Sequence, residues 1–302
     1  MRVGVVLLWA ACANLALAAV GGERVVARAS GERILHEERS LYRNILVYES
    51  NSQRCLKFGR SATDRQSCQQ LGNPDYLVFN YTRMMMAALY LNPAPARVLV
   101  IGLGGGTLPN ALRKVIPAAR IDVVEIDPAV VKVAHQYFGF TTGPAMREFE
   151  EDGRVFVKHK LKEGARYDLV MLDAFTDQYI PEHLLTREFL TEVKSILTPR
   201  GVLAANTFAT SSLYEHESAT YESVFGPFYG LKSRNRVILV RLGGLPPRGE
   251  IEGNARELDS RLRVLGAGKE GLLPLFAVES GWVGKSRVLT DQYSPGNLLN
   301  AQ

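Results

Sequence analysis

The chain has 302 residues, of which 46% are hydrophobic and 22% are charged, a composition typical of a folded globular protein. A chain of this length buries a sizeable core, in one large domain or in two of which one is small. The formal net charge is +5, but the Lys and Arg residues are scattered singly and form neither a block nor a helical stripe. This distribution argues against a nucleic-acid-binding surface.

The first residues have the pattern of a secretory signal peptide. Arg2 precedes an apolar stretch that Asn14 interrupts, and Ala18 and Ala19 offer small residues for cleavage. The stretch falls short of the about 20 apolar residues that a membrane-spanning helix needs. The sequence therefore predicts a leader at residues 1–19 and an exported, periplasmic or secreted protein without a stable membrane anchor after leader cleavage.

Export decides how the three cysteines are interpreted. Cys12 follows two alanines, as at a lipoprotein cleavage site, but Trp9 stands where a small aliphatic residue would be expected, so lipidation is not predicted. Cys55 and Cys68 remain after cleavage, an even pair in an oxidising compartment. They lie at equal spacing about a predicted turn at 59–63. A cross-strand disulfide and two unpaired thiols both remain open.

Residues 20–95 form a β-rich region with a connecting helix. Strand patterns occur at Ile45–Ser50 and Arg54–Gly59, and a helical stretch follows from Asp75 to Leu91. Two closely spaced prolines in Asn92-Pro93-Ala94-Pro95 end that helix, because neither can continue it. This segment is the predicted boundary between the two parts of the chain.

Residues 96–302 begin with alternating strands and helices. This alternation predicts an α/β fold with a doubly wound, mostly parallel sheet covered by helices on both faces. The predicted strands are Arg97–Ile101, Ile121–Glu125, Tyr167–Leu172 and Val202–Asn206, and the predicted helices are Thr107–Val115, Pro128–Tyr137 and Thr186–Leu197.

A ligand of such a sheet binds at the carboxyl ends of the strands, where the strand order reverses. The glycines from Gly102 to Gly106 follow the first of these strands, and Glu125 ends the next. Glycine lets a ligand approach the backbone closely. An acid at the end of the second strand can accept hydrogen bonds from both hydroxyls of an adenosine ribose. The full G-x-G-x-x-G pattern fails at Thr107, so nicotinamide enzymes are disfavoured relative to adenosyl-sulfonium transferases.

Two further acids follow later strand regions: Asp152, before Gly153, and Asp173, at the end of the apolar segment YDLVMLD. With these residues the chain resembles the spermidine synthases, or polyamine aminopropyltransferases, and in particular their exported or membrane-linked bacterial members. The resemblance runs through VLVIGLGGG, VVEID, EDG and LDAF. It implies a Rossmann-like sheet of the class I methyltransferase type behind a small amino-terminal β-rich domain, with residues 96–302 as the nucleoside-binding catalytic part.

The resemblance also assigns roles to single residues. The family transfers an aminopropyl group from decarboxylated S-adenosylmethionine to an amine and releases methylthioadenosine. Asp173 resembles the acid that orients the attacking amine and receives its proton, and Tyr81 resembles the family's active-site tyrosine. The predicted nucleoside-binding residues are Gly102, Gly104 and Gly105 of the turn, Glu125 for the ribose, and Asp152 with Gly153 for the adenine.

The chain departs from the family pattern in the amine half. Gly105 replaces an aspartate that grips the aminopropyl amine, and Tyr81-Thr82-Arg83 replaces a motif that ends in an acid. The catalytic loop places its second acid, Asp177, one residue late. Asp177 and Glu182 are the candidates to compensate for the missing carboxylates.

Other polar residues have a structural reading beside the functional one. His183 either shuttles protons or merely begins an amphipathic helix, and Asp291 either lines the site or caps a turn. Asp127 is expected to cap the helix that follows it, and Met84–Met86 to fill the core. The histidines show no metal-ligand spacing, so no metal site is predicted.

Three functions remain open. The leading one is aminopropyl transfer to a polyamine-type amine, a small-molecule substrate. The first alternative is a methyltransferase that uses intact S-adenosylmethionine, favoured by the missing aspartate at Gly105. The second is a non-catalytic nucleoside or polyamine binder that kept the fold. The resemblance also implies a homodimer.

Overall fold

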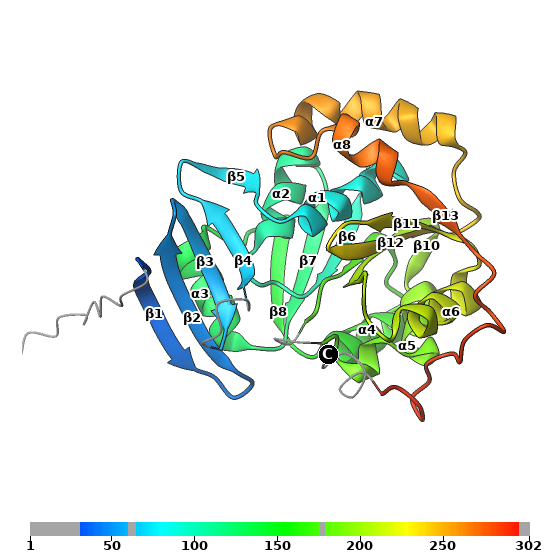
Figure 1. Ribbon diagram of the computed structural model, residues 1–302, viewed down its shortest axis with the longest axis horizontal. Coiled ribbons are helices and arrows are strands. Elements are labelled where there is room, and N and C mark those ends of the chain that lie inside the picture. The colour runs from blue at the N-terminus through cyan, green and yellow to red at the C-terminus, as the bar shows by residue number, and fades with distance from the viewer. Residues whose placement is uncertain (1–30, 60–64, 176–178, 296–302) are drawn as a thin grey trace, which may run out of the picture.

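The computed structural model describes residues 31–59, 65–175 and 179–295 (Figure 1). The predicted leader and Asp177 lie outside these residues. No helix in the described ranges is long and apolar enough to cross a membrane.

The amino-terminal sheet has five antiparallel strands in sequence order. They are β1 (Arg33–Arg39), β2 (Asn44–Ser50), β3 (Gln53–Phe58), β4 (Arg65–Gln70) and β5 (Asn73–Leu77). Ile45, Val47 and Leu56 form one apolar face, which packs on α3 (Pro128–Phe138). The sheet is thereby fixed against the main body of the protein.

Cys55 and Cys68 are directly paired residues of β3 and β4 and form a disulfide. Their Cα atoms are 4.1 Å apart. The structure thus decides between the two alternatives left open by the sequence, and it does so in favour of the cross-strand bond.

The prediction of a helix from Asp75 to Leu91 is wrong for the first residues of that segment. Asn73–Leu77 forms β5, and the helical part comprises α1 (Asn80–Met86) and the 3₁₀ helix η1 (Ala87–Tyr90). Leu77 pairs with Gln69 of β4, and its N–H donates to the Leu265 carbonyl. These tertiary hydrogen bonds favour an extended backbone over the local helical pattern.

The central sheet has eight strands in the order β13-β11-β12-β10-β9-β6-β7-β8. The strands β6 to β10 are parallel to their neighbours in this group, and β11, β12 and β13 extend the sheet antiparallel. The bounds are β6 (Arg97–Ile101), β7 (Arg120–Glu125), β8 (Met146–Glu150), β9 (Tyr167–Leu172), β10 (Leu197–Phe208), β11 (Phe228–Lys232), β12 (Asn235–Arg241) and β13 (Ala277–Glu279). The predicted doubly wound, mostly parallel sheet is confirmed, and its order reverses between β6 and β9.

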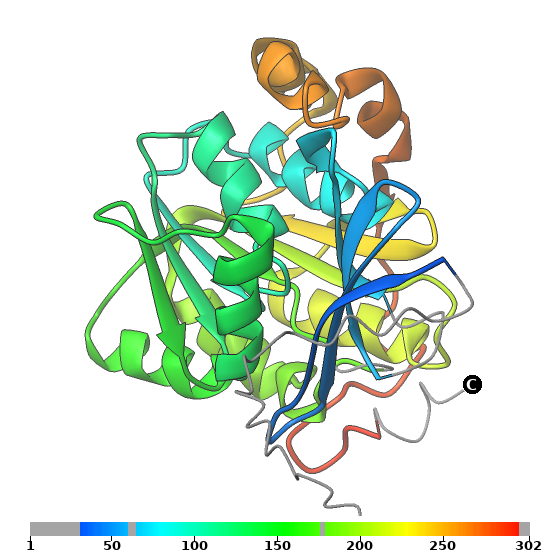
Figure 2. The ribbon, with the colours of Figure 1, turned by 90° about the vertical axis from the view of Figure 1, so that its left-hand side faces the viewer.

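Helices cover both faces of this sheet, with α7 and α8 on one side and α4 and α5 on the other (Figure 1, Figure 2). The sheet has one hydrophobic core on each face. In β6, Val98 and Val100 belong to the first core, on one face, and Leu99 and Ile101 belong to the second core, on the other. A strand buried on both faces needs apolar residues without alternation, which explains the continuous run in the sequence. The remaining helices are α2 (Thr107–Val115), α4 (Gly153–Lys162), α5 (Arg187–Ser195), α6 (Tyr214–Phe225), α7 (Arg248–Arg263) and α8 (Lys269–Leu272), with 3₁₀ turns η2 (Glu182–Leu184) and η3 (Leu273–Leu275).

Met84, Met85 and Met86 are fully buried in the first of these cores, as expected for core-filling residues. The helix predicted at Thr186–Leu197 is shorter than expected, since Thr186 caps α5 through its side chain and Leu197 already begins β10. The helix α5 and the strand β10 nevertheless occur in the order that the sequence predicts.

Candidate active site

A cavity opens at the carboxyl ends of β6, β7 and β9, where the strand order reverses. The space measures about 870 Å³ when the solvent at its open mouth is included, and β4 and α1 form the opposite wall. The sequence-predicted residues that line it are Tyr81, Gly102, Gly104, Glu125, Asp152, Gly153 and Asp173. These seven residues come from five separate segments of the chain and meet around one space.

The turn after β6 depends on glycine at Gly102. Its φ is +98°, and a Cβ there would lie 2.3 Å from the backbone carbonyl oxygen of Asp173. The Gly102 N–H donates to the Val124 carbonyl at 2.8 Å. The absence of a side chain thus lets the ends of β6, β7 and β9 come together.

Gly105 is not a wall residue of this cavity, contrary to the role predicted for it. A Cβ at Gly105 would lie 2.7 Å from Ser67 Oγ and 3.1 Å from the Phe138 ring. Gly105 lies instead behind the turn, where it lines a second cavity. Close packing against β4 and the end of α3 explains why residue 105 is a glycine.

Glu125 joins the glycine turn to the end of β7. Its Oε2 accepts the Leu103 N–H at 3.0 Å, and its Oε1 accepts the Asp127 N–H at 3.1 Å. Burial raises the pKa of Glu125, whereas the two N–H donors lower it. Each carboxylate oxygen keeps a second lone pair, so the side chain can still accept hydrogen bonds from ligand hydroxyls.

Asp152 caps α4 and also contacts His183. Its Oδ1 accepts the N–H groups of Arg154 and Val155 at 2.9 and 3.0 Å, and its Oδ2 lies 2.8 Å from His183 Nε2. Burial raises the pKa of Asp152, but these hydrogen bonds outweigh burial and hold it below the usual value. His183 is the middle residue of the short turn η2 and forms part of the cavity wall.

Asp127 is the helix cap that the sequence predicts. Its Oδ1 accepts the Ala129 N–H at 3.0 Å, and its Oδ2 accepts the Ser40 hydroxyl at 2.6 Å. Gly153, beside the other cap, packs against β6, because a Cβ there would lie 2.5 Å from Ile101 Cγ2.

Asp173 has the environment of a catalytic base. Loss of solvent raises its pKa to about 7, and hydrogen bonds from Asn206 and Tyr81 oppose this rise. Asn206 Nδ2 donates to Asp173 Oδ1 at 2.9 Å, and Asn206 Oδ1 accepts Asn235 Nδ2 at 3.1 Å. The Asp173 carboxylate is therefore held by the Asn206 amide, which is held in turn by the Asn235 amide.

The Tyr81 hydroxyl lies between Asp173 and β4. Its O–H donates to the Gln66 carbonyl at 3.4 Å, and the Asp173 carboxylate is near enough to influence its pKa. Burial raises the pKa of Tyr81 well above its usual value, and the charge of Asp173 raises it further. The phenol consequently stays protonated and acts as a donor.

Arg83, which replaces an acid of the family motif, points to the backbone instead of the cavity. Its Nε donates to the Leu77 carbonyl at 2.7 Å, and its guanidinium lies over the Tyr76 ring. The substitution thus serves the connection between β5 and α1.

Glu182 does not line the main cavity, so the structure does not support its predicted role beside Asp173. It lines a neighbouring cavity together with His183 and Asp291. Asp291 accepts both terminal nitrogens of Arg154, at 2.7 and 2.8 Å, which ties the last described segment to α4. In the described part of the chain, no group of three or more His, Cys, Asp or Glu residues could hold a metal ion.

Sequence reasoning missed several residues of the main cavity or its support. Asn206 is a polar amide in the otherwise largely apolar segment VLAANTF, a signal that could have found it. Arg43 lines the cavity from the β1–β2 connection, with its guanidinium 4.3 Å from the Phe58 ring centroid. Gln66 and Ser67 come from β4 and carried no recognisable motif.

Comparisons with known proteins address the family and the fold of the chain. A family model described as the spermine/spermidine synthase domain matches residues 78–237. A polyamine aminopropyltransferase of Vibrio vulnificus (strain CMCP6) is 46% identical over 272 residues, covering 88% of this chain and 91% of that protein. A probable spermidine synthase from Corynebacterium glutamicum ATCC 13032 has a similar fold, with a TM-score of 0.66 and 19% identity, covering 85% of this chain and 96% of that one.

A second kind of relative is the human methyltransferase-like protein 13, whose structure was solved in complex with SAH. It is 31% identical with a TM-score of 0.57, and the match covers 61% of this chain and 93% of that one. The family model spans more than half of the chain, and the aminopropyltransferase match spans most of both proteins. The chain belongs to the spermine/spermidine synthase family.

Proposed function

We propose that this protein is an aminopropyltransferase that moves an aminopropyl group from decarboxylated S-adenosylmethionine to an amine and releases methylthioadenosine. The observation that carries the proposal is the Asp173 carboxylate, oriented by Tyr81 and Asn206 and placed across from the glycine turn. The 46% identity to a polyamine aminopropyltransferase supports the same reaction.

The reaction needs a free amine and a positioned donor. Asp173 accepts a proton from the acceptor amine, and its charge attracts the cationic substrate. The amine nitrogen then bonds to the carbon beside the sulfonium, the carbon–sulfur bond breaks, and its electrons stay on sulfur as methylthioadenosine leaves. Holding both reactants in line supplies most of the rate enhancement.

The nucleoside half would be held by the turn at Gly102 and Gly104, by Glu125 at the ribose and by Asp152 at the adenine. Because Glu125 and Asp152 also bind backbone N–H groups, each is already oriented before a ligand arrives. Such preorganisation lowers the entropy cost of binding.

Methyl transfer from S-adenosylmethionine is the second candidate. It is favoured by the likeness to methyltransferase-like protein 13. That likeness covers 61% of the chain, whereas the aminopropyltransferase match covers 88%.

Product analysis separates these functions. Incubation with decarboxylated S-adenosylmethionine and a set of amines, putrescine among them, should yield methylthioadenosine and an aminopropylated amine. Asp173→Asn should lower kcat by about 10² to 10⁴, the usual contribution of a general base, with nucleoside affinity kept. Methylated product together with preference for S-adenosylhomocysteine would instead establish methyl transfer. Nucleoside binding without turnover of any donor would leave a non-catalytic binder.

The pH profile tests the role of Asp173. Because the base acts in its ionised form and its pKa is raised to about 7, kcat/KM should rise with pH through about 7. Asn206→Leu removes a donor that favours the ionised form, so the rise should move to higher pH. Asn235→Ala, one hydrogen bond further away, should cause a smaller shift in the same direction. An unchanged midpoint in Asn206→Leu would exclude Asp173 as the titrating base.

The nucleoside turn gives a prediction of its own. Gly102→Ala places a methyl group against the Asp173 carbonyl and strains a positive φ, so methylthioadenosine binding should be lost and unfolding should require about 1–3 kcal/mol less free energy. Gly143→Ala meets nothing within 4 Å and should change stability by less than about 0.5 kcal/mol. Calorimetric titration and urea unfolding measure both quantities. Normal nucleoside binding by Gly102→Ala would contradict the assignment of the turn.

We further propose that the protein acts after export, with residues 1–19 removed. The apolar leader and the disulfide both support an oxidising compartment outside the cytoplasm. The mass of the protein recovered from a periplasmic fraction should correspond to cleavage after Ala18 or Ala19. Recovery of the uncleaved chain in the cytoplasm would refute the proposal.

A further inference from the structure

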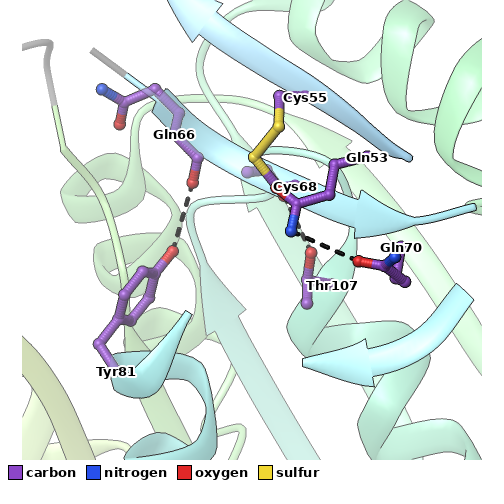
Figure 3. Close-up of a disulfide and its surroundings, with 8 residues drawn as sticks. Gln53, Cys55, Gln66, Cys68, Gln70, Tyr81 and Thr107 are labelled. Carbon is purple, nitrogen blue, oxygen red and sulfur yellow. Dashed lines mark hydrogen bonds between the residues drawn. A yellow bond between two sulfur atoms is a disulfide. The ribbon is translucent and has the colours of Figure 1, made fainter. Parts of the chain in front are cut away.

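The strand β4 lies directly against the active site. Its residues Gln66 and Ser67 line the main cavity, and the next residue, Cys68, is bonded to Cys55 of β3 (Figure 3). We propose that the Cys55–Cys68 disulfide and Ser67 form a positioning element of the active site, which holds the glycine turn and Tyr81 in their binding geometry. The catalytic consequence rests on the proposed function, whereas the positioning itself does not.

Ser67 connects β4 to the nucleoside half of the site. Its hydroxyl lies 2.9 Å from Thr107 Oγ1, at the first residue of α2, and its side chain is buried. Behind it, Gly105 leaves room for the same hydroxyl, since a Cβ there would lie 2.7 Å away. Ser67 is thus packed into the turn and would disturb it if β4 moved.

Gln66 connects the same strand to the amine half. Its backbone carbonyl accepts a hydrogen bond from the Tyr81 hydroxyl at 3.4 Å (Figure 3). The same phenol lies close to the Asp173 carboxylate. A shift of β4 would therefore change the surroundings of both halves of the cavity at once.

The disulfide acts on these contacts through the strand and not from within the cavity. Cys55 and Cys68 cluster with Leu46 and Tyr48 on one face of the sheet. Successive side chains of a strand point to opposite faces, so Ser67 points to the other face, toward the turn. The covalent bond and the site contact are on adjacent residues of one strand.

The pairing of β4 is irregular on both sides of this bond. The register with β3 shifts between Leu56 and Lys57, and the register with β5 shifts between Gln69 and Gln70. A slip of one residue would turn Ser67 away from the turn, because it reverses the face of every side chain. The cross-link excludes such a slip at the position nearest the site.

The side-chain hydrogen bonds of Gln69 and Gln70 in β4 are long, in contrast to the 2.9 Å contact of Ser67 with Thr107. Gln53 Nε2 lies 3.4 Å from Gln70 Oε1, and Gln69 Nε2 lies 3.5 Å from the Phe138 carbonyl. Weak bonds of this kind hold a register less firmly than a covalent bond. The Gln53–Gln70 pair also provides a matched control, since it joins the same two strands at the end away from the cavity (Figure 3).

The test compares Cys55→Ser/Cys68→Ser with Gln53→Ala/Gln70→Ala. Methylthioadenosine affinity is measured by calorimetry at a temperature where circular dichroism shows each protein to be folded. The cysteine pair should weaken binding about tenfold, whereas the glutamine pair should stay within about twofold. A disulfide with a merely structural role would lower the Tm and leave the Kd of the folded protein unchanged, which would overturn the proposal.

Hydrogen exchange provides a readout that needs no ligand. Amides of 103–108 should exchange faster in the cysteine pair than in wild type and in the glutamine pair. Equal exchange in wild type and the cysteine pair overturns the proposal, whatever the activity. Faster exchange in a protein that shows no aminopropyl turnover supports the positioning element and refutes only the proposed function.

Ser67→Ala keeps the disulfide and serves if the cysteine pair fails to fold. Loss of the hydroxyl contact to Thr107 should accelerate exchange in 103–108 and weaken methylthioadenosine binding, with a Tm closer to that of wild type. Unchanged exchange in Ser67→Ala would show that β4 does not hold the turn and would likewise overturn the proposal.

Discussion

The contact of the Gly102 backbone with the Asp173 carbonyl is the constraint on which the site depends. No side chain fits between them, since a Cβ at Gly102 would lie 2.3 Å from that oxygen. The ends of β6 and β9 can therefore approach each other closely, and residues at these two ends line one cavity. The distance between the nucleoside and amine halves is consequently set by the backbone of the sheet.

The carboxylates around the cavity have different tasks because their partners differ. Glu125 and Asp152 accept backbone N–H groups and so connect the ends of strands to the elements that follow. Asp173 accepts a hydrogen bond from Asn206 and lies close to the Tyr81 phenol, and burial raises its pKa to about 7. An acid with that pKa exchanges protons readily near neutral pH, as a base for an amine requires.

The amino-terminal sheet completes the site from outside the parallel sheet. Ser67 and the Gln66 carbonyl approach the turn and Tyr81 from β4, and Arg43 approaches from the β1–β2 connection. The substitution at Arg83 is compatible with this wall, because the guanidinium binds carbonyls of the β5–α1 connection. The chain therefore resembles the family in the amine half of the site as well. Some of the contacts that support this half, however, come from residues that depart from the family pattern.

The sequence by itself determined the elements whose signals are local. The bounds of β6, α2 and β9 agree to the residue with those expected from the apolar runs and the glycine turn. Glu125, Asp152 and Asp173 line one cavity because each lies at, or just after, the carboxyl end of a parallel strand. Tertiary structure alone decided the extended form of Asn73–Leu77, the disulfide, and the places of Asn206, Ser67 and Gly105. These depend on strand pairing and packing between residues far apart in the chain, and no periodicity within a short segment records which strand will become its neighbour.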